Sequence, residues 1–222
     1  CGIATDILLR KYDLKSVAYV DNDAHQGDGV FSSFEEEPRL ILADMHEDGK
    51  YLYPGTGAVT ETGKGDAAGT KLNIPMPPHA DDELFFRMWP HLESFLVKQK
   101  PEFILLQCGA DSIDGDPITH LKYSEKAHAH AARRLAQVAN EHCGGKLLAL
   151  GGGGYNHDNI AKTWTAVVEA LATGEQIIIS INRRDAVVVV VGDYQKAAVI
   201  SNECERSYSP YRFLTFVRND NI

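Results

Sequence analysis

The chain has 222 residues, of which 44% are hydrophobic and 24% are charged, and this length and composition suit one sizeable α/β domain of a globular protein. No apolar run approaches the roughly 20 residues needed to span a bilayer, and the four cysteines show no CxxC spacing, so we expect no membrane segment and reduced thiols in the cytoplasm. The formal net charge of −9 argues against a broad surface for nucleic-acid phosphates.

Short apolar runs alternate with longer helical patterns along the chain. The predicted strands are residues 17–20, 40–43, 103–106 and 147–150, and the predicted helices are residues 81–98, 124–141 and 156–172. Pro90 predicts a kink in the first of these helices. The alternation predicts an α/β fold with a mostly parallel sheet and helices on both faces, and it places ligands at the carboxyl ends of the strands.

Two stretches of the sequence lack this regular pattern. Residues 44–70 are rich in Gly, Asp and Glu and are long for a connector, which favours a functional loop. After Glu175 the pattern changes to β-branched runs and then to a polar end. We therefore expect one domain over residues 1–174 and a separate segment, residues 175–222, to which the sequence assigns no role.

Asp21, Asp23 and His25 follow the first predicted strand at a spacing of two residues. Side chains two apart on a strand point the same way, so we expect these three to share one face. Two carboxylates and an imidazole on one face call for a cation, and three such ligands with an open fourth position are typical of catalytic zinc. The alternative is a polar loop in which Asp21 or Asp23 caps the next helix.

Two later strands end in a similar way. Asp111 follows the strand at residues 103–106 and is predicted to reach the same sheet edge, where it could supply a third metal ligand. Asp114 and Asp116 look like ordinary turn residues. The strand at residues 147–150 leads into four glycines, of which Gly153 and Gly154 are expected to contact the substrate, because glycine lets the backbone pass close to a ligand.

Tyr155 follows these glycines at the start of the next predicted helix. Its phenol could stabilise a developing oxyanion at the metal site, or its ring could simply pack on the sheet. A glycine-rich loop between a strand and a helix can also bind phosphate. However, the spacing is not GxGxxG and no Lys-Ser/Thr pair follows, so we expect no nucleotide cofactor.

These features together resemble the histone deacetylase and acetoin-utilisation deacetylase family of the arginase-deacetylase superfamily. The matching segments occur in family order between about residues 17 and 172, and they are residues 19–30, 53–57, 73–75, 107–112, 115–117 and 150–159. The resemblance implies a three-layer αβα fold that is incomplete at its N-terminus. Because the chain starts at Cys1 without an initiator Met, we expect it to have been cut from a longer protein.

The resemblance also implies a catalytic site in which a metal-bound water attacks an acetamide carbonyl. One Zn²⁺ per chain would be held by Asp23, His25 and Asp111. Tyr155 would hydrogen-bond the carbonyl oxygen, and Asp21 would orient a catalytic histidine. The remaining implied contacts are a K⁺ site near Asp21, Asp23, His25 and Asp44, and an apolar tunnel for the acyl-lysine stem lined by Tyr53 and Ile118.

Three positions depart from the family pattern. Gln26 stands where many members have a second His, and Asp44 stands where Ser is commonest near the potassium site. The tandem His pair that serves as general base and acid would precede Cys1. No histidine of this chain outside the metal site matches that pair, namely His46, His79, His91, His120, His128, His130, His142 and His157.

The sequence therefore favours a zinc-dependent deacetylase that acts on acetylated lysine in proteins or on a small acetyl-amide such as an acetyl-polyamine. It indicates no direct nucleic-acid partner, and it carries no signal for an oligomeric state. The first alternative is a ureohydrolase of the arginase type, which needs two Mn²⁺ and a further Asp-x-Asp cluster. The second alternative is a metal-binding fragment without turnover.

Overall fold

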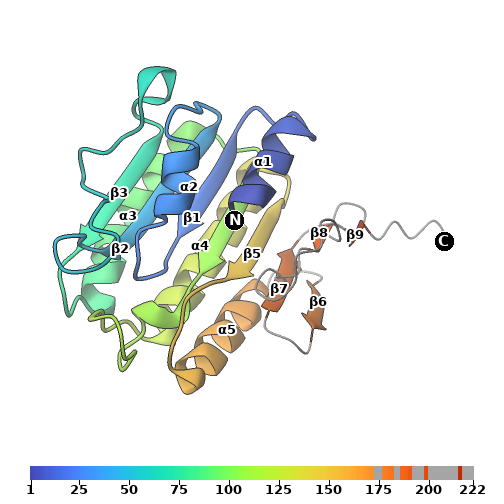
Figure 1. The fold of residues 1–222 in the computed structure, drawn as a ribbon. Coiled ribbons are helices and arrows are strands. Elements are labelled where there is room, and N and C mark those ends of the chain that lie inside the picture. Colours follow the sequence, from blue (N-terminus) through green and yellow to red (C-terminus); the bar gives the residue numbers. More distant parts are fainter. Residues whose placement is uncertain (173–176, 183–185, 192–197, 200–214, 217–222) are drawn as a thin grey trace, which may run out of the picture.

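A seven-stranded sheet forms the centre of the molecule (Figure 1). The computed structural model describes residues 1–172, 177–182, 186–191, 198–199 and 215–216. Five strands are parallel, and their order across the sheet is β3 (Lys71–Met76), β2 (Leu40–Glu47), β1 (Val17–Asp21), β4 (Phe103–Cys108) and β5 (Leu147–Gly151). Beyond β5 lie two antiparallel strands, β7 (Ala186–Val191) and β6 (Ile177–Asn182). A separate antiparallel pair consists of β8 (Ala198–Val199) and β9 (Thr215–Phe216).

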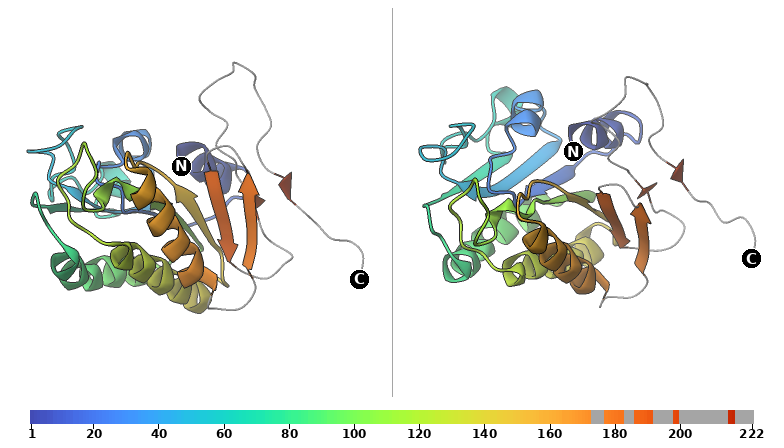
Figure 2. Two further views of the ribbon diagram at one scale, coloured as in Figure 1. Left: turned by 90° about the horizontal axis from the view of Figure 1, so that it is seen from below. Right: turned by 60° about the horizontal axis from the view of Figure 1, so that its bottom comes forward.

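Helices cover both faces of this sheet, as Figure 2 shows. One face carries α1 (Gly2–Arg10) and α2 (Asp28–Ser33), and the other carries α3 (Asp82–Gln99), α4 (Glu125–His142) and α5 (His157–Ala172). Two apolar cores result, one on each side of the sheet, because successive strand residues point to opposite faces. The predicted three-layer αβα architecture with a mostly parallel sheet is confirmed. No described helix has the length and apolar character needed to cross a bilayer.

The predicted elements all occur, with boundaries that shift by one to four residues. The helices begin where side chains can cap them: Asp81 accepts from the N–H of Leu84, and Ser124 accepts from that of Lys126. Helix α3 continues unbroken through Pro90, where the sequence predicts a kink. Asp44 belongs to β2, which runs on to Glu47, so the expected irregular loop at residues 44–70 begins four residues too early.

Strand register brings the polar ends of several strands to one edge of the sheet. Asp21, the last residue of β1, lies beside Asp44 of β2 and beside Gln107 of β4. Cys108, at the end of β4, pairs with Gly151 at the end of β5. The segments that follow β1, β4 and β5 therefore leave the sheet close together, as expected for the ligand-binding edge of a parallel sheet.

His128 of α4 is a buried histidine whose protonation state affects folding. Ser112 Oγ donates to the carbonyl of Asn22 (3.0 Å), so its one proton is used and His128 Nε2 must donate to Oγ (2.8 Å). His128 Nδ1 is then an unprotonated, buried nitrogen without a hydrogen-bond partner within the described structure. Burial lowers the pKa of His128 to about 4.

We expect this histidine to make the metal-free chain sensitive to mild acid. The unfolded chain binds a proton below a pKa of about 6.5 while the folded chain does not, so stability should fall from pH 6.5 towards pH 4. This difference between the pKa in the folded and in the unfolded chain corresponds to about 3 kcal/mol of unfolding free energy. Urea unfolding in the presence of a chelator should show a smaller loss for His128→Gln. The exposed His91→Gln serves as the control, and equal losses in all three proteins would contradict the prediction.

Candidate metal centre

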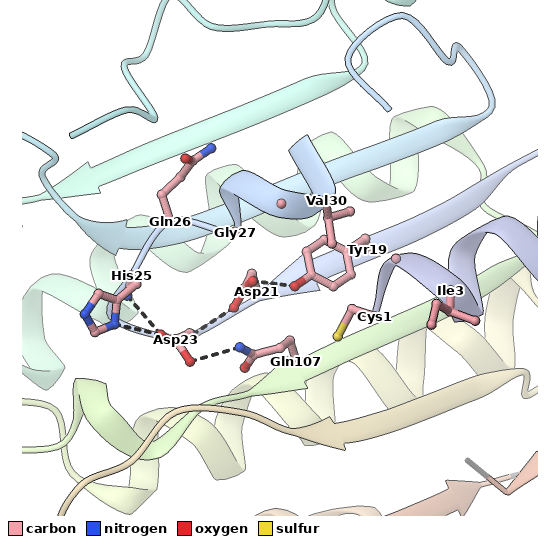
Figure 3. A pocket seen from close by; sticks show the side chains of 12 residues that line it. Cys1, Ile3, Tyr19, Asp21, Asp23, His25, Gln26, Gly27, Val30 and Gln107 are labelled. Atoms are coloured by element: carbon pink, nitrogen blue, oxygen red, sulfur yellow. Dashed lines mark hydrogen bonds and ion pairs between the residues drawn. The ribbon is translucent and has the colours of Figure 1, made fainter. Parts of the chain in front are cut away.

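Asp23, His25 and Asp111 converge at this edge of the sheet. Asp23 and His25 lie just beyond β1, and Asp111 lies in the short 3-10 helix η2 (Ala110–Ser112) just beyond β4. His25 Nδ1 lies 2.8 Å from Asp111 Oδ2 and 3.2 Å from Asp23 Oδ1. The potential ligand atoms of the three residues all lie within 4.8 Å of one another. Figure 3 shows His25 and Asp23 facing each other at the end of β1.

The convergence has a different cause from the one that the sequence pattern predicts. Strand β1 ends at Asp21, and residues 23–25 form a bend rather than a continued strand. Asp21 Oδ1 accepts from the N–H of Asp23 (3.0 Å), and Asp23 Oδ1 accepts from the N–H of His25 (3.0 Å). Two successive Asx turns therefore gather these residues, and the expected strand alternation over residues 21–25 is wrong.

The charges at this cluster indicate that it suits a cation. Burial raises the pKa of Asp111 to about 6, and hydrogen bonds to Asp111 and then to Asp23 raise the pKa of His25 to about 10. Burial also raises the pKa of Asp23, but hydrogen bonds from His25 and its neighbours outweigh this and hold it below its usual value. The protonated imidazole thus places a positive charge between two buried carboxylates, where a metal ion could lie instead. One nitrogen and two oxygen ligands fit Zn²⁺, which would replace that proton.

A set of surrounding hydrogen bonds fixes the two carboxylates. Gln107 Nε2 donates to Asp23 Oδ2 (2.9 Å), and the N–H of Gly153 donates to the same oxygen (2.8 Å). Asp111 Oδ1 accepts from the N–H of Ala24 (2.8 Å). The sequence pattern assigns no role to Gln107, which is marked locally only as a polar residue near the end of an apolar strand. Such outer contacts orient metal ligands and usually matter for affinity.

We expect Gln107→Leu to weaken Zn²⁺ binding by about 10- to 100-fold, which is typical when a residue that orients a ligand is lost. The leucine keeps the approximate volume of the side chain but removes the donor to Asp23. Titration of the metal-free variant against a zinc indicator would measure the effect. Gln137→Leu, at an exposed position on α4, is the matched control and should bind zinc like the unchanged chain. Equal affinities for all three proteins would contradict this role of Gln107.

The glycine-rich loop packs directly against the predicted ligands. A Cβ atom at Gly153 would lie 2.3 Å from Asp111 Oδ2 and 2.8 Å from Asp23 Oδ2. Gly154 has a φ of +142°, a conformation that side chains rarely adopt, and its backbone packs against Ile160. The predicted contact of these two glycines with substrate remains a prediction, to which the structure adds a contact of Gly153 with both carboxylates.

A second pair of buried acidic residues lies near the predicted metal ligands. Asp21 and Asp44 are almost fully buried, and a Cβ atom at Gly27 would lie 2.7 Å from Asp21 Oδ2 and 3.4 Å from Asp44 Oδ2. Burial and then the neighbouring charge of Asp44 raise the pKa of Asp21 well above its usual value. His46 Nδ1 contacts Asp44 Oδ1 (2.8 Å), and its Nε2 contacts the carbonyl of Gly57 (3.1 Å). Two buried carboxylates that both lie close to Gly27 could together hold a monovalent cation.

Three of the other predicted site residues lie at the molecular surface. Tyr53, Ile118 and Tyr155 are 74%, 46% and 56% exposed. Asp21 accepts hydrogen bonds from the hydroxyl of Tyr19 (2.5 Å) and from the N–H of Asp23, and neither of these donors within the described residues is a histidine. Gln26 is buried and accepts from the hydroxyl of Thr56 (2.7 Å).

A cavity of about 500 Å³ adjoins Asp23 and His25, two of the three predicted metal ligands. Its lining includes Asp21, Asp23, His25, Gln107 and the N-terminal residue Cys1, and Figure 3 shows these side chains around it. The cluster is therefore open on one side, as a site that must admit a small molecule requires.

Comparison with known proteins identifies relatives of this arrangement. The model of the histone deacetylase domain matches residues 1–171. The acetoin utilization protein AcuC of Bacillus subtilis is 37% identical over 156 residues, which are 70% of this chain and 40% of that protein. A probable deacetylase of Archaeoglobus fulgidus is 34% identical over 166 residues, which are 74% of this chain and 46% of that protein. The chain thus spans less than half of the length of these curated relatives.

Solved structures also superpose on this chain. The histone deacetylase Clr3 superposes with a TM-score of 0.70 at 27% identity, over 77% of this chain and 29% of that chain. The HD domain of HDA15 superposes with a TM-score of 0.69 at 27% identity, over 78% of this chain and 50% of that chain.

Proposed function

Because the chain belongs to the histone deacetylase family, we propose that it carries the metal-binding part of a zinc-dependent deacetylase. Its substrates would be acetyl-lysine in histone-like proteins or a small acetyl-amide such as an acetyl-polyamine. The observation that carries this proposal is the convergence of Asp23, His25 and Asp111 beside an open cavity. Three ligands with access from one side are typical of a catalytic rather than a structural zinc site.

The residues of the site have distinct roles in this proposal. Bound Zn²⁺ would lower the pKa of a water molecule and polarise the acetamide carbonyl. Asp23 and Asp111 supply the negative charge that holds the ion, and Gln107 and Gly153 fix the orientation of Asp23. Tyr155 would donate a hydrogen bond from its phenol to the carbonyl oxygen.

Six further assignments belong to the proposal. Gly153 and Gly154 would line the substrate path, and Tyr53 and Ile118, both exposed, would form its rim. Asp21 would orient a catalytic histidine, and K⁺ would bind near Asp21 and Asp44, whose buried carboxylates support a cation there. The deacetylase domain would extend over residues 1–174, which the family match over residues 1–171 supports. A cytoplasmic location is supported by the free thiols of Cys108 and Cys143.

Release of acetate from an acetylated histone-tail peptide and from an acetyl-polyamine tests this function. The zinc-loaded chain should release acetate, a chelator should stop the release, and one equivalent of Zn²⁺ should restore it. No histidine of this chain matches the tandem pair of the family, and such proton-transfer groups contribute about 10² to 10⁴ in rate. The assay therefore needs high enzyme concentration and long incubation.

Two other outcomes would favour the alternatives. Bound zinc without any release of acetate would support a metal-binding chain without turnover and would contradict deacetylation by this chain. Release of urea from arginine with two bound Mn²⁺ would support a ureohydrolase. The described residues disfavour that alternative, because they form one cluster of three metal-ligating groups rather than a binuclear set.

A further inference from the structure

Residues 111–119 form a loop that leaves a metal ligand and returns to it. The loop begins at Asp111 and turns at Gly115, which has a φ of +86°. Its end is fastened to its beginning, because the hydroxyl of Thr119 donates to the backbone carbonyl of Asp111. Ile118, which is expected on the substrate rim, therefore lies in a short closed loop that also contains the proposed ligand Asp111.

Asp116 connects this loop to the segment that carries Tyr155. The residue is buried, with 8% of its surface exposed. Oδ2 accepts from the backbone N–H of Tyr155 (2.9 Å), and Oδ1 accepts from the backbone N–H of Ile118 (3.0 Å). The bond to Ile118 is a local turn contact, but the bond to Tyr155 joins residues that are 39 positions apart. Ordinary turn chemistry, which the sequence predicts for Asp116, therefore describes only half of its contacts.

Two asparagines at the start of α5 make further hydrogen bonds to the same loop. Asn156 Nδ2 donates to the carbonyl of Gly115 (3.2 Å), and Asn159 Nδ2 donates to the carbonyl of Asp114 (3.1 Å). Tyr155 follows Gly154, which has a φ of +142°, and the bond from its backbone N–H to Asp116 is one restraint on the segment between the glycine-rich loop and α5.

We propose that Asp116 is a positioning residue whose single carboxylate fixes the backbone of Tyr155 and of Ile118 relative to the metal ligand Asp111. This inference rests on the proposed role of Tyr155 as the hydrogen-bond donor to the substrate carbonyl. Geometric precision matters here, since a displacement of about 1 Å at a reacting group can lower a rate by about 10²-fold. Asp116→Asn removes one acceptor while it keeps the shape of the side chain.

A double-mutant cycle on the zinc-loaded chain tests this inference without relying on turnover. The probe is acetohydroxamate, which binds zinc and presents a carbonyl oxygen, and its affinity is measured by calorimetry. Tyr155→Phe and Asp116→Asn should each weaken its binding by about 5- to 10-fold, as expected for one hydrogen bond. The double variant should be no weaker than either single variant, because both changes disrupt the same contact. Zinc affinity should not change in any of them.

Asp114→Asn is the matched control. It makes the same change of charge in the same loop at an exposed side chain, and it should leave hydroxamate binding unchanged. A structural defect, in contrast, would lower zinc affinity and would add to the effect of Tyr155→Phe. Additive losses, or full hydroxamate affinity in Asp116→Asn, would overturn the inference.

Amide hydrogen exchange of the unsubstituted chain provides a test that does not depend on the folding of a variant. The amides of Tyr155 and Ile118 should be protected although both side chains are exposed, and exchange of both at the rate of an open chain would overturn the inference. The experiments distinguish a failure of the proposed function from a failure of this inference. Absence of acetate release with an intact double-mutant cycle contradicts only the deacetylase function. Loss of hydroxamate affinity in Tyr155→Phe but not in Asp116→Asn contradicts only the role of Asp116.

Discussion

Replacement of Asp111 by Ala is expected to lower the affinity of the chain for Zn²⁺ by about 10² to 10³-fold. Structural zinc sites bind with about 10–16 kcal/mol, which is roughly 2.5–4 kcal/mol for each of four ligands. Asp111 is fully buried, and its two oxygens contact His25 Nδ1 and the N–H of Ala24. The substitution therefore removes one ligand and also one restraint on another. Titration of the metal-free protein with zinc, by competition with a chelator of known affinity, measures the change.

Asp114→Ala is the control for this experiment because it removes an exposed carboxylate three residues away. It should bind zinc like the unchanged chain, which would show that general loss of negative charge is not the cause. Retention of one tightly bound zinc in the Asp111→Ala variant would refute the assignment of Asp111 as a ligand.

Gly153→Ala is expected to weaken zinc binding by about 10²-fold although it removes no ligand. The added methyl group would lie 2.3 Å from Asp111 Oδ2, a separation that real side chains do not show. Either the loop or the carboxylates must move, and the loop is held by the bond from Gly153 N–H to Asp23 and by the bond from Ala110 N–H to the Gly153 carbonyl (2.6 Å). The same titration measures the loss.

The corresponding control is Gly29→Ala in α2. A Cβ atom at Gly29 would meet nothing within 4 Å, and alanine is the better helix former by about 1 kcal/mol. This variant should keep full zinc affinity with equal or greater stability. If Gly153→Ala also kept full affinity, the close packing of the glycine loop against the two carboxylates would not constrain the metal site.

The strands that could be predicted are those whose burial is visible in the local sequence. β1, β2, β4 and β5 each begin with a continuous apolar run of four residues, because both faces of the sheet are covered. β3 was missed because Lys71 and Pro75 interrupt the apolar pattern. Lys71 is nevertheless buried, since its ammonium donates to the carbonyls of Glu37 and Leu40 and to the hydroxyl of Thr70. Two of these acceptors lie more than 30 residues away, where no local pattern could indicate them.

The helices α1 and α2 were also missed, for a related reason. α2 has only six residues and begins within the polar Gly-Asp-Gly segment, so its sequence carries hardly more than one turn of periodic pattern. α1 begins at Gly2 without a capping side chain, and Cys1 gives no start signal of the usual kind. Both helices owe their stability to apolar contacts with the sheet face rather than to local signals.

The candidate ligand residues could be predicted from the sequence, but the residues that hold the site in place could not. Asp23, His25 and Asp111 are residue types with metal-binding chemistry that follow predicted strands, so a general rule on parallel sheets places them together. The roles of Gln107 and Asp116 depend on partners 84 and 39 positions away, namely Asp23 and Tyr155. Side-chain identity and spacing do not encode such contacts, which become visible only in the folded chain.

X-ray absorption at the zinc edge, combined with metal analysis, tests the central claim most directly. The claim is that Asp23, His25 and Asp111 hold a single zinc ion. It predicts one zinc per chain, with one imidazole and otherwise oxygen ligands at about 2.0–2.2 Å. A sulfur ligand near about 2.3 Å, or two metal ions per chain, would contradict it.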